Sequence, residues 1–268
     1  MRIIKLVVLL SGISLSIMWS RKQENLNVVF ISGSNEYVSH ITLKNYKKAL
    51  ENKYPNVKVT ILQADGSINE KDEFSNLNGT DVLKDCHVLL TFARRTTISG
   101  KAIEDIKKYV NSGKPLVALR TSSHGFQSWP GFDKEVLGGN YSFHYKGEPE
   151  KREIGADGMR YTVGQPSGPV QTVSINPVNK NHPILAGIQN FSSKYSLYKT
   201  SPIASDATLL LTGKTTEGEE PVAWSRNHKG GRIVYIGLGG VQDWQNPVFV
   251  KLVTNSLFWA ADFKAKSK

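Results

Sequence analysis

Four short polar segments hold the side chains best suited to bind a ligand or move a proton, and each follows an apolar run. In chain order they contain Glu36 and Tyr37, then Arg94, then Arg120 to His124, and finally Asp243. A histidine can accept or donate a proton near neutral pH. Arginines can hold carbonyl, hydroxyl or anionic oxygens. These residue types suit proton transfer on a ligand that is rich in oxygen.

Arg120 directly follows an apolar run, where an unpaired guanidinium would be costly to bury. Two explanations are open: a structural ion pair with Glu36 or Asp243, or contact with an anionic or polyhydroxyl ligand. Arg94-Arg95 is a similar case. We expect one of these two arginines, assigned as Arg94, at the site and the other in solvent.

The histidines also have two interpretations. His124 could be a general acid or base, or a structural residue bonded to a backbone carbonyl. His144 ends a segment that contains Gly138 and Gly139, where the backbone can approach a ligand closely. The predicted catalytic residues are His124, Arg120 and Asp243. The predicted substrate-binding residues are Glu36, Tyr37, Arg94, Thr121, Ser123, Trp129, Asn140, Tyr141 and His144.

Other kinds of chemistry have weaker support. His124, His144 and an acid such as Asp243 could bind zinc, but no H-x-H or H-E-x-x-H spacing occurs. No cofactor is therefore predicted to be required. The single cysteine, Cys86, precedes a strand, and the G-x-S-x-G nucleophile motif is absent. Walker A and G-x-G-x-x-G phosphate loops are absent as well.

Alternating strand and helix patterns predict the frame that brings the polar segments together. Apolar runs at 27–32, 57–62, 87–92 and 115–119 are typical of buried parallel strands. Helical spacing predicts one helix that ends at Pro55 and another capped by Ser99. This alternation predicts a doubly wound α/β sheet. Such sheets bind ligands beyond the carboxyl ends of their strands, so all four polar segments are expected at that edge.

The second half of the chain is less regular. Residues 129–202 are rich in Gly, Pro, Asn and Ser, so an irregular insertion packed on the sheet is expected. Strands are predicted at 208–212, 221–224 and 232–236, the last two joined by a hairpin turn. A final helix begins at Asn246-Pro247. The expected organisation is one domain over 27–262, followed by a basic tail at 263–268.

Charge and the N-terminus bear on partners and location. The formal charge is +11, but the lysines are scattered over predicted helix faces, so nucleic acid is not an expected partner. Residues 1–20 join Arg2 and Lys5 to an apolar run, as in a secretory signal peptide. The cleavage site is poorly defined, which leaves open an uncleaved N-terminal anchor as the one contact with a membrane. A secreted or periplasmic location is expected.

Several motifs in order resemble the trehalose-utilisation (ThuA-like) family, in its secreted branch. The run 89–126 contains an R-T-x-S-H motif, and the segments 129–133 and 136–141 continue the resemblance. Further matching segments are His182-Pro183-Ile184, Ser196 to Lys199, Pro221 to Trp224 and Asn255 to Ala260. Together they span nearly all of residues 27–261.

The resemblance implies a flavodoxin-like, mostly parallel sheet similar to that of class I glutamine amidotransferases. It also implies a role in carbohydrate metabolism, with keto-sugars or disaccharides as suspected substrates. Arg120-Thr121-Ser122 stands where an amidotransferase carries its nucleophilic cysteine, which disfavours glutaminase activity. Relatives commonly carry L-G-H at Leu238-Gly239-Gly240, and many carry histidine at position 120. This chain would then use His124 and Asp243 for the step those histidines perform, or lack that step.

Two functions stay open. The first is an exported enzyme, a sugar hydrolase or isomerase, in which His124 moves a proton while Arg120, Arg94 and Asn140 hold oxygens. In that enzyme a sugar ring would stack on Trp129, Tyr141 or Trp244. The second is a non-catalytic carbohydrate-binding accessory protein, favoured by the lack of an unambiguous nucleophile. In both, the expected partner is a small-molecule carbohydrate.

Overall fold

The computed structural model describes residues 25–66, 74–145, 152–155, 160–162 and 172–266. The predicted signal segment at 1–20 lies outside these residues. Within the described ranges, none of the helices has the length and apolar character needed to cross a membrane.

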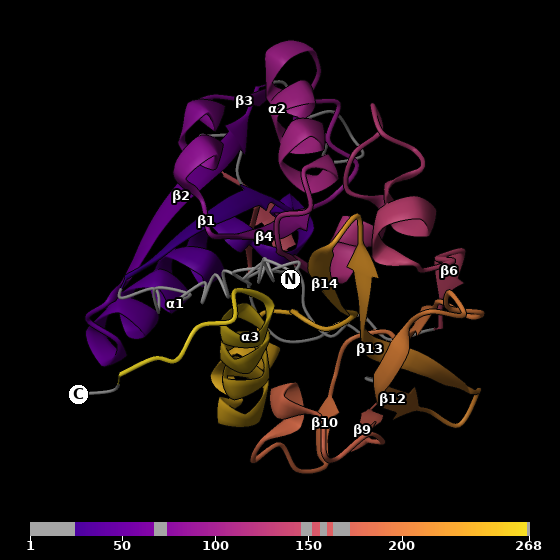
Figure 1. The fold of residues 1–268 in the computed structure, drawn as a ribbon. Helices are drawn as coiled ribbons and strands as arrows, with labels where there is room; N and C mark the ends of the chain where they lie inside the picture. The colour runs from indigo at the N-terminus through magenta and orange to yellow at the C-terminus, as the bar shows by residue number, and fades with distance from the viewer. Residues whose placement is uncertain (1–24, 67–73, 146–151, 156–159, 163–171, 267–268) are drawn as a thin grey trace, which may run out of the picture.

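A ten-stranded sheet forms the frame of the molecule (Figure 1), in the order β10-β9-β12-β13-β14-β5-β4-β1-β2-β3. Its parallel centre consists of β2 (Val57–Asp65), β1 (Leu26–Gly33), β4 (Val88–Ala93), β5 (Leu116–Leu119) and β14 (Gly231–Ile236). Numbered along the chain, these five strands have the 2-1-3-4-5 order of flavodoxin-like folds. The predicted doubly wound α/β fold is confirmed.

The rest of the sheet is antiparallel, so the sheet as a whole is mixed. The hairpin turn predicted before β14 is present, with Lys229 and Gly230 both at positive φ as a tight two-residue turn requires. The antiparallel strands are β3 (Asn76–Leu77), β9 (Val173–Pro177), β10 (Phe191–Ser193), β12 (Thr208–Lys214) and β13 (Glu219–His228).

The region expected to be an irregular insertion is partly regular. Its β9 and β10 extend the main sheet, because β12 offers them a free edge to pair with. Two small ladders lie outside the main sheet and pair β6 (Phe143–His144) with β11 (Tyr198–Lys199), and β7 (Arg152–Ile154) with β8 (Arg160–Thr162). Within the described residues, the insertion expected at 129–202 is therefore irregular apart from short elements such as these strands.

The three α-helices are α1 (Ser39–Lys53), α2 (Gly100–Asn111) and α3 (Pro247–Ala260). α3 begins as predicted, with Asn246 accepting a hydrogen bond from the amide of Val248 at 2.9 Å and proline in the first turn. Ser99 stands at the N-cap position of α2, but its side chain makes no capping hydrogen bond. The predicted Ser99 cap is therefore wrong in its chemistry.

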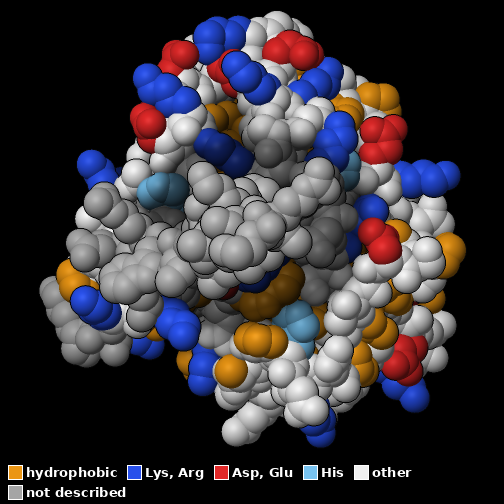
Figure 2. Space-filling view, in the orientation of Figure 1, with side chains coloured by type: hydrophobic (Ala, Val, Ile, Leu, Met, Phe, Trp, Pro, Cys, Tyr) orange, Lys and Arg blue, Asp and Glu red, His pale blue; other side chains and the backbone are white. Residues whose placement is uncertain are grey.

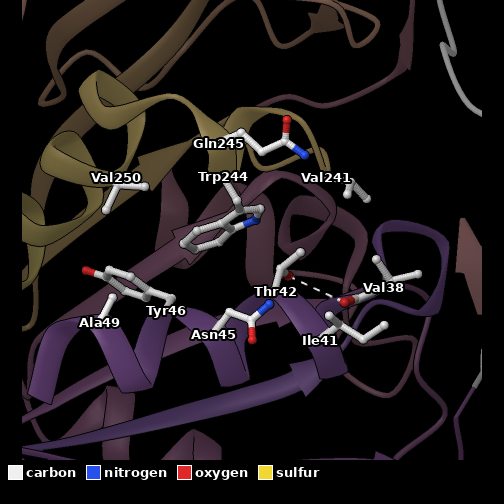
Figure 3. Close-up of a pocket in the computed structure, with 10 residues that line it drawn as sticks. All are labelled: Val38, Ile41, Thr42, Asn45, Tyr46, Ala49, Val241, Trp244, Gln245 and Val250. Atoms are coloured by element: carbon white, nitrogen blue, oxygen red, sulfur yellow. Dashed lines mark hydrogen bonds between the residues drawn. The ribbon is translucent and has the colours of Figure 1, made fainter. Parts of the chain in front are cut away.

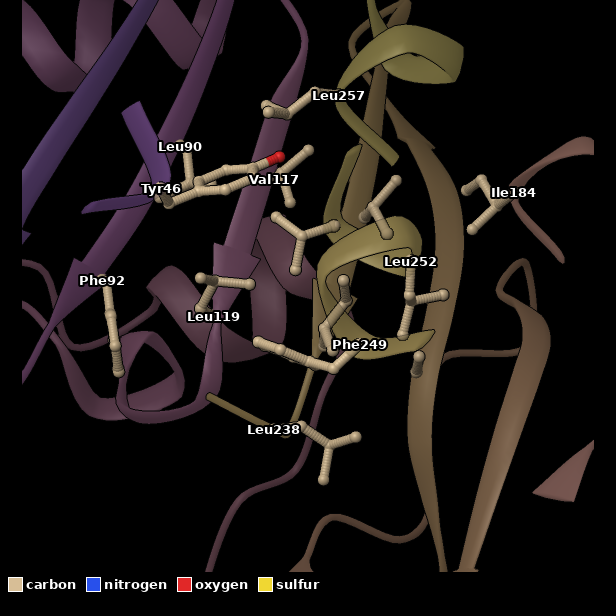
Figure 4. Close-up of a cluster of buried hydrophobic side chains, with 14 of the residues drawn as sticks. Tyr46, Leu90, Phe92, Val117, Leu119, Ile184, Leu238, Phe249, Leu252 and Leu257 are labelled. Atoms are coloured by element: carbon tan, nitrogen blue, oxygen red, sulfur yellow. The ribbon is translucent and has the colours of Figure 1, made fainter. Parts of the chain in front are cut away.

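Apolar side chains alternate between the two faces of the sheet and form a hydrophobic core on each face. On β5, Val117 and Leu119 join the core beneath α1 and α3, which Figure 4 shows in part. Leu116 and Ala118 face the other way and join the core beneath α2. This alternation is the period-two pattern of a strand buried on both faces. The domain extends through Phe263, one residue beyond the expected boundary, because Phe263 is buried against Phe258.

Charged side chains of both signs are mixed over α2, at the top of the molecule in Figure 2. Lys101 lies 3.1 Å from Asp81, and Lys107 lies 2.9 Å from Glu104. The lysines predicted on this helix face are therefore in contact with acidic neighbours.

Candidate functional site

The four predicted polar segments meet at one edge of the sheet, because β1, β4, β5 and β14 are parallel and end there. They form the short helices η1 (Asn35–Tyr37), η3 (Arg120–His124) and η6 (Asp243–Gln245) and the loop after β4. Two backbone hydrogen bonds join the loops after β4 and β5: Arg95 N–H to the His124 carbonyl at 2.9 Å, and Thr96 N–H to the Gly125 carbonyl at 2.7 Å. The predicted convergence therefore has a physical basis in the topology.

Three non-glycine residues at this edge have left-handed backbone conformations. They are Val38, Arg95 and Arg120, with φ of 44°, 47° and 38°. Such conformations cost roughly 1–3 kcal/mol each and concentrate at functional sites. Sequence reasoning missed this signal, because valine and arginine are not the residues that usually mark left-handed turns.

Arg120 is fully buried beneath the edge. Its Nη1 donates to the Gly237 carbonyl at 3.0 Å, and its Nη2 donates to the carbonyl and Oγ of Ser196 at 3.2 and 3.0 Å. The guanidinium also lies over the rings of Tyr198 and Tyr37, 4.4 and 4.6 Å from their centroids. Arg120 is therefore held by protein groups and anchors the loops from below.

Asp243 is buried within its own loop. Its Oδ2 accepts hydrogen bonds from the amides of Gly239 at 3.0 Å and Gly240 at 2.9 Å. Burial raises the pKa of Asp243, and these amide bonds oppose that rise. These contacts stabilise the conformation of the loop that carries Asp243. Its catalytic role stays a prediction.

Gly240 stands where relatives commonly carry the histidine of an L-G-H pattern, and the structure gives a steric reason for this glycine. A Cβ added to Gly240 would lie 2.0 Å from Cδ2 of Tyr195, whose ring fills that space. The Tyr195 ring also contacts Tyr37 edge-on at 5.7 Å, and Arg120 lies 5.6 Å from its centroid. In this chain the aromatic rings around Arg120 occupy the space that a side chain at position 240 would need.

Several predicted binding residues lie below the surface of the site. Tyr37 is buried and stacks on Phe92, and Thr121 donates to the Ser34 hydroxyl at 3.0 Å. Glu36 forms an ion pair with Arg94. Arg95 was expected in solvent if Arg94 lay at the site, but both arginines are half-buried. Within the described ranges the Arg95 side chain has no hydrogen bond or ion pair, so Arg95 is a candidate that sequence reasoning missed.

The Ser123 hydroxyl lies between the Arg120 carbonyl, at 3.2 Å, and Nδ1 of His124, at 3.1 Å. When this hydroxyl donates to the carbonyl, it accepts from Nδ1–H, and Nε2 carries the lone pair. Burial, followed by the charges of Arg94, Arg95, Arg120 and His144, lowers the pKa of His124 from 6.5 to about 3. The imidazole is therefore neutral at physiological pH.

Aromatic rings surround His124. Tyr141 stacks on it at 4.4 Å, and Tyr198 lies 6.0 Å away. His144, which pairs with Tyr198 across β6 and β11, lies 6.2 Å from the Tyr198 ring. Nδ1 of His144 donates to the Tyr145 carbonyl at 2.8 Å. The two histidines thus share one aromatic cluster.

A pocket of about 320 Å³ opens on one side of His124. Five predicted residues line it: Ser123, His124, Trp129, Asn140 and Tyr141. Asn140 is exposed and donates to the Ser201 carbonyl at 3.0 Å. Gln127 and Asp133 also line the pocket and were missed by sequence reasoning, although Asp133 stands in one of the quoted motifs.

A larger cavity of about 440 Å³ lies between α1 and η6, and Figure 3 shows its lining. Trp244 and Tyr46 face it, with ring centroids 5.1 Å apart. None of the predicted catalytic or substrate-binding residues lines this cavity. Trp244, proposed with Trp129 and Tyr141 as a stacking surface, therefore lines a different cavity from theirs.

The zinc set considered from the sequence is not assembled in the part of the chain that the structure describes. No three His, Cys, Asp or Glu side chains there lie close enough together to hold a metal ion.

Comparisons with known proteins agree with this fold. A family model described as ThuA, trehalose utilisation, matches residues 27–260. A putative ThuA-like protein from Parabacteroides merdae is 18% identical with a TM-score of 0.62, covering 91% of this chain and 92% of its own. One from Bacteroides uniformis is 15% identical with a TM-score of 0.59, covering 90% and 93%.

A β-galactosidase from Rahnella sp. R3 is 12% identical with a TM-score of 0.55, over 90% of this chain but 32% of that enzyme. At these identities the solved structures show likeness of fold alone. A search of curated proteins found no match. The family model spans most of the domain and the ThuA-like structures share its fold, so the chain belongs to the ThuA, trehalose-utilisation family.

Proposed function

We propose that this protein acts on a keto-sugar or an oxidised disaccharide by proton transfer, with His124 as the base. Membership of a family described as trehalose utilisation supports a carbohydrate substrate. The observation that carries the proposal is the state of His124: its pKa is lowered to about 3, its Nδ1 lies 3.1 Å from the Ser123 hydroxyl, and none of the described residues hydrogen-bonds to its Nε2. Residues 1–20 support export as part of the same proposal.

The step removes a proton from the carbon next to a sugar carbonyl. The proton moves to Nε2 of His124, the electron pair of the C–H bond forms a carbon–carbon double bond, and the π pair of the carbonyl moves to its oxygen to give an enediolate. The proton of the neighbouring hydroxyl then moves to that oxygen, and return of the proton from Nε2 to the former carbonyl carbon gives the isomer. No co-reactant is needed, because the proton that leaves one carbon returns to another.

The arginines near His124 have opposite effects on the resting base and on the transition state. Burial, followed by the charges of these arginines, lowers the pKa of the resting imidazole and makes it a weak base. The same charges stabilise the negative charge that develops on the substrate oxygen. That oxyanion in turn favours the protonated imidazole, so His124 becomes more basic as the reaction proceeds.

Exchange with solvent deuterium tests the proposal. Trehalose and trehalose oxidised to a ketone are incubated with the protein in D₂O, and products are followed by NMR and mass spectrometry. We expect deuterium at the carbon beside the carbonyl, with the rate reduced roughly 10²–10⁴-fold in His124→Gln. His228→Gln is the matched control, because His228 lies in the β13–β14 hairpin.

Two other results are informative. Free monosaccharides that depend on His124 would assign hydrolysis in place of isomerisation. Saturable binding without exchange or cleavage would contradict catalysis and favour the accessory protein, a function consistent with Arg120 standing where a nucleophile would be expected.

A further inference from the structure

Asp133 is an acid near His124 that the proposed step leaves unused. It lies in the short π-helix η4 (Phe132–Leu137) and lines the pocket beside His124. Its Oδ2 accepts the amide hydrogen of Tyr141 at 2.8 Å. Because Tyr141 stacks on His124, this bond links Asp133 to the position of the base.

The second carboxyl oxygen of Asp133 has no partner. Oδ1 is buried, and among the residues that the structure describes nothing hydrogen-bonds to it. Buried acceptors are nearly always satisfied, and an orphaned one costs stability. Because Asp133 lines the pocket beside His124, a hydrogen-bond donor on a ligand bound there would satisfy this oxygen.

The surrounding backbone makes room for this carboxyl. A Cβ added to Gly139 would lie 2.4 Å from Oδ1, so a side chain at position 139 would displace it. Burial also raises the pKa of Asp133 to about 6, and no cation opposes the rise. The carboxyl is therefore held in an apolar environment without the ion pair that usually accompanies a buried acid.

The rest of the pocket suits a sugar ring. Its volume of about 320 Å³ is within the range of small-molecule sites. Trp129, half-buried against Phe132 at 5.0 Å, offers an aromatic face for the C–H side of a pyranose. Gln127 and Asn140 add amide groups at the rim. An aromatic face beside a carboxyl and two amides matches the apolar faces and hydroxyl edge of a hexose.

We propose that Asp133 accepts a hydrogen bond from a ring hydroxyl of a hexose unit in this pocket and so selects a hydroxylated ring. This inference rests on the proposed carbohydrate function, and it assigns the subsite that holds the sugar next to His124. The acceptor is a carboxyl that the fold leaves unsatisfied, so a deoxy ring cannot replace the hydroxylated one without loss.

Deoxy sugars test the inference on the unmodified protein. Trehalose, methyl α-glucoside and a series of monodeoxy analogues are titrated by calorimetry. We expect one analogue to bind roughly tenfold or more weakly than its parent, because it lacks the hydroxyl that donates to Asp133.

Asp133→Asn identifies the acceptor. The variant keeps an oxygen for the Tyr141 amide but weakens the contact with the hydroxyl, so the parent sugar should bind about tenfold more weakly. The deoxy analogue that binds weakly to the wild type should bind to this variant with nearly the same affinity. Glu135→Gln makes the same chemical change at an exposed position of η4 and should leave binding unchanged.

The outcomes separate the two proposals. If Asp133→Asn binds the parent sugars like the wild type and every deoxy analogue binds equally, the subsite is wrong, while exchange that depends on His124 would still support the proposed function. If binding depends on Asp133 but no exchange or cleavage occurs, the subsite stands and catalysis fails. If none of the sugars binds to the wild type, the inference is overturned.

Discussion

Arg120 and Arg95 are the same residue type in the same unusual backbone conformation, in loops that follow neighbouring strands. Arg120 is fully buried and donates three hydrogen bonds to protein oxygens. Arg95 is half-buried, and in the described ranges its side chain has no such bond. The guanidinium of Arg120 is therefore bonded to the protein, whereas that of Arg95 remains able to bind a ligand.

The same contrast holds between two regions of the site. In the lower region, made of Arg120, Asp243, Tyr195 and Gly240, Arg120 and Asp243 hydrogen-bond to protein groups, and the Tyr195 ring fills the space beside Gly240. In the upper region, around His124 and its pocket, Nε2 of His124, the Arg95 side chain and Oδ1 of Asp133 have no hydrogen bond to the described residues. Position at the sheet edge brings residues near a ligand, but burial decides which of them can touch it.

The largest expected effect is on stability, in the lower region. Arg120→Met removes the donors to two buried carbonyls and the cation between the tyrosine rings. We expect a loss of about 3–4 kcal/mol in the free energy of unfolding, measured with urea. The stability of Arg120→Lys should lie between those of the wild type and the methionine variant, because lysine keeps the charge but lacks the guanidinium fork. A methionine variant as stable as the wild type would contradict the assignment of Arg120 as an anchor.

Overpacking of the lower region should cost somewhat less. Gly240→Ala places a methyl group against the Tyr195 ring, and we expect a loss of about 1–3 kcal/mol. The same substitution should cost little in a Tyr195→Ala background, because the conflict is then relieved. Equal costs in the two backgrounds would show that the ring does not occupy the space at position 240.

In the upper region, the lowered pKa of His124 should make the stability of the protein depend on pH. The pKa of His124 falls from 6.5 in the unfolded chain to about 3 in the fold, so between these values the folded state binds fewer protons. Stability is fully present above pH 6.5 and is lost as the pH falls toward 3. At pH 5 the wild type should have lost about 2 kcal/mol more than His124→Gln. Parallel curves for the two proteins between pH 7 and 5 would contradict the lowered pKa.

The sequence was sufficient for the elements of the frame and for the meeting of the four loops. Apolar runs such as 27–32 carry the strand signal, and parallel strands necessarily end at one edge. The addition of β9 and β10 to the main sheet was not predicted, because their pairing depends on the edge that β12 provides.

The division of the site into two regions was not predictable from the sequence. Residue type alone does not say whether Arg120 points into the protein or toward a ligand, since both outcomes leave it after an apolar strand. Asp133 was missed because its significance depends on Gly139 and Tyr141, which approach it through the tertiary fold. Left-handed arginines carry no sequence signature.

The smallest expected change in stability, and the sharpest test of the comparison, is at Arg95. Arg95→Asn should alter the free energy of unfolding by no more than about 0.5 kcal/mol, because no hydrogen bond or ion pair with the described residues is lost and asparagine tolerates the left-handed conformation. The same variant should slow deuterium exchange into the keto-sugar by roughly 10²-fold, because it removes a cation beside the developing oxyanion. The pKa of His124 should rise as well, since the charge of Arg95 helps to lower it. A large loss of stability with unchanged exchange would make Arg95 a second anchor like Arg120, and the contrast between the two arginines would fail.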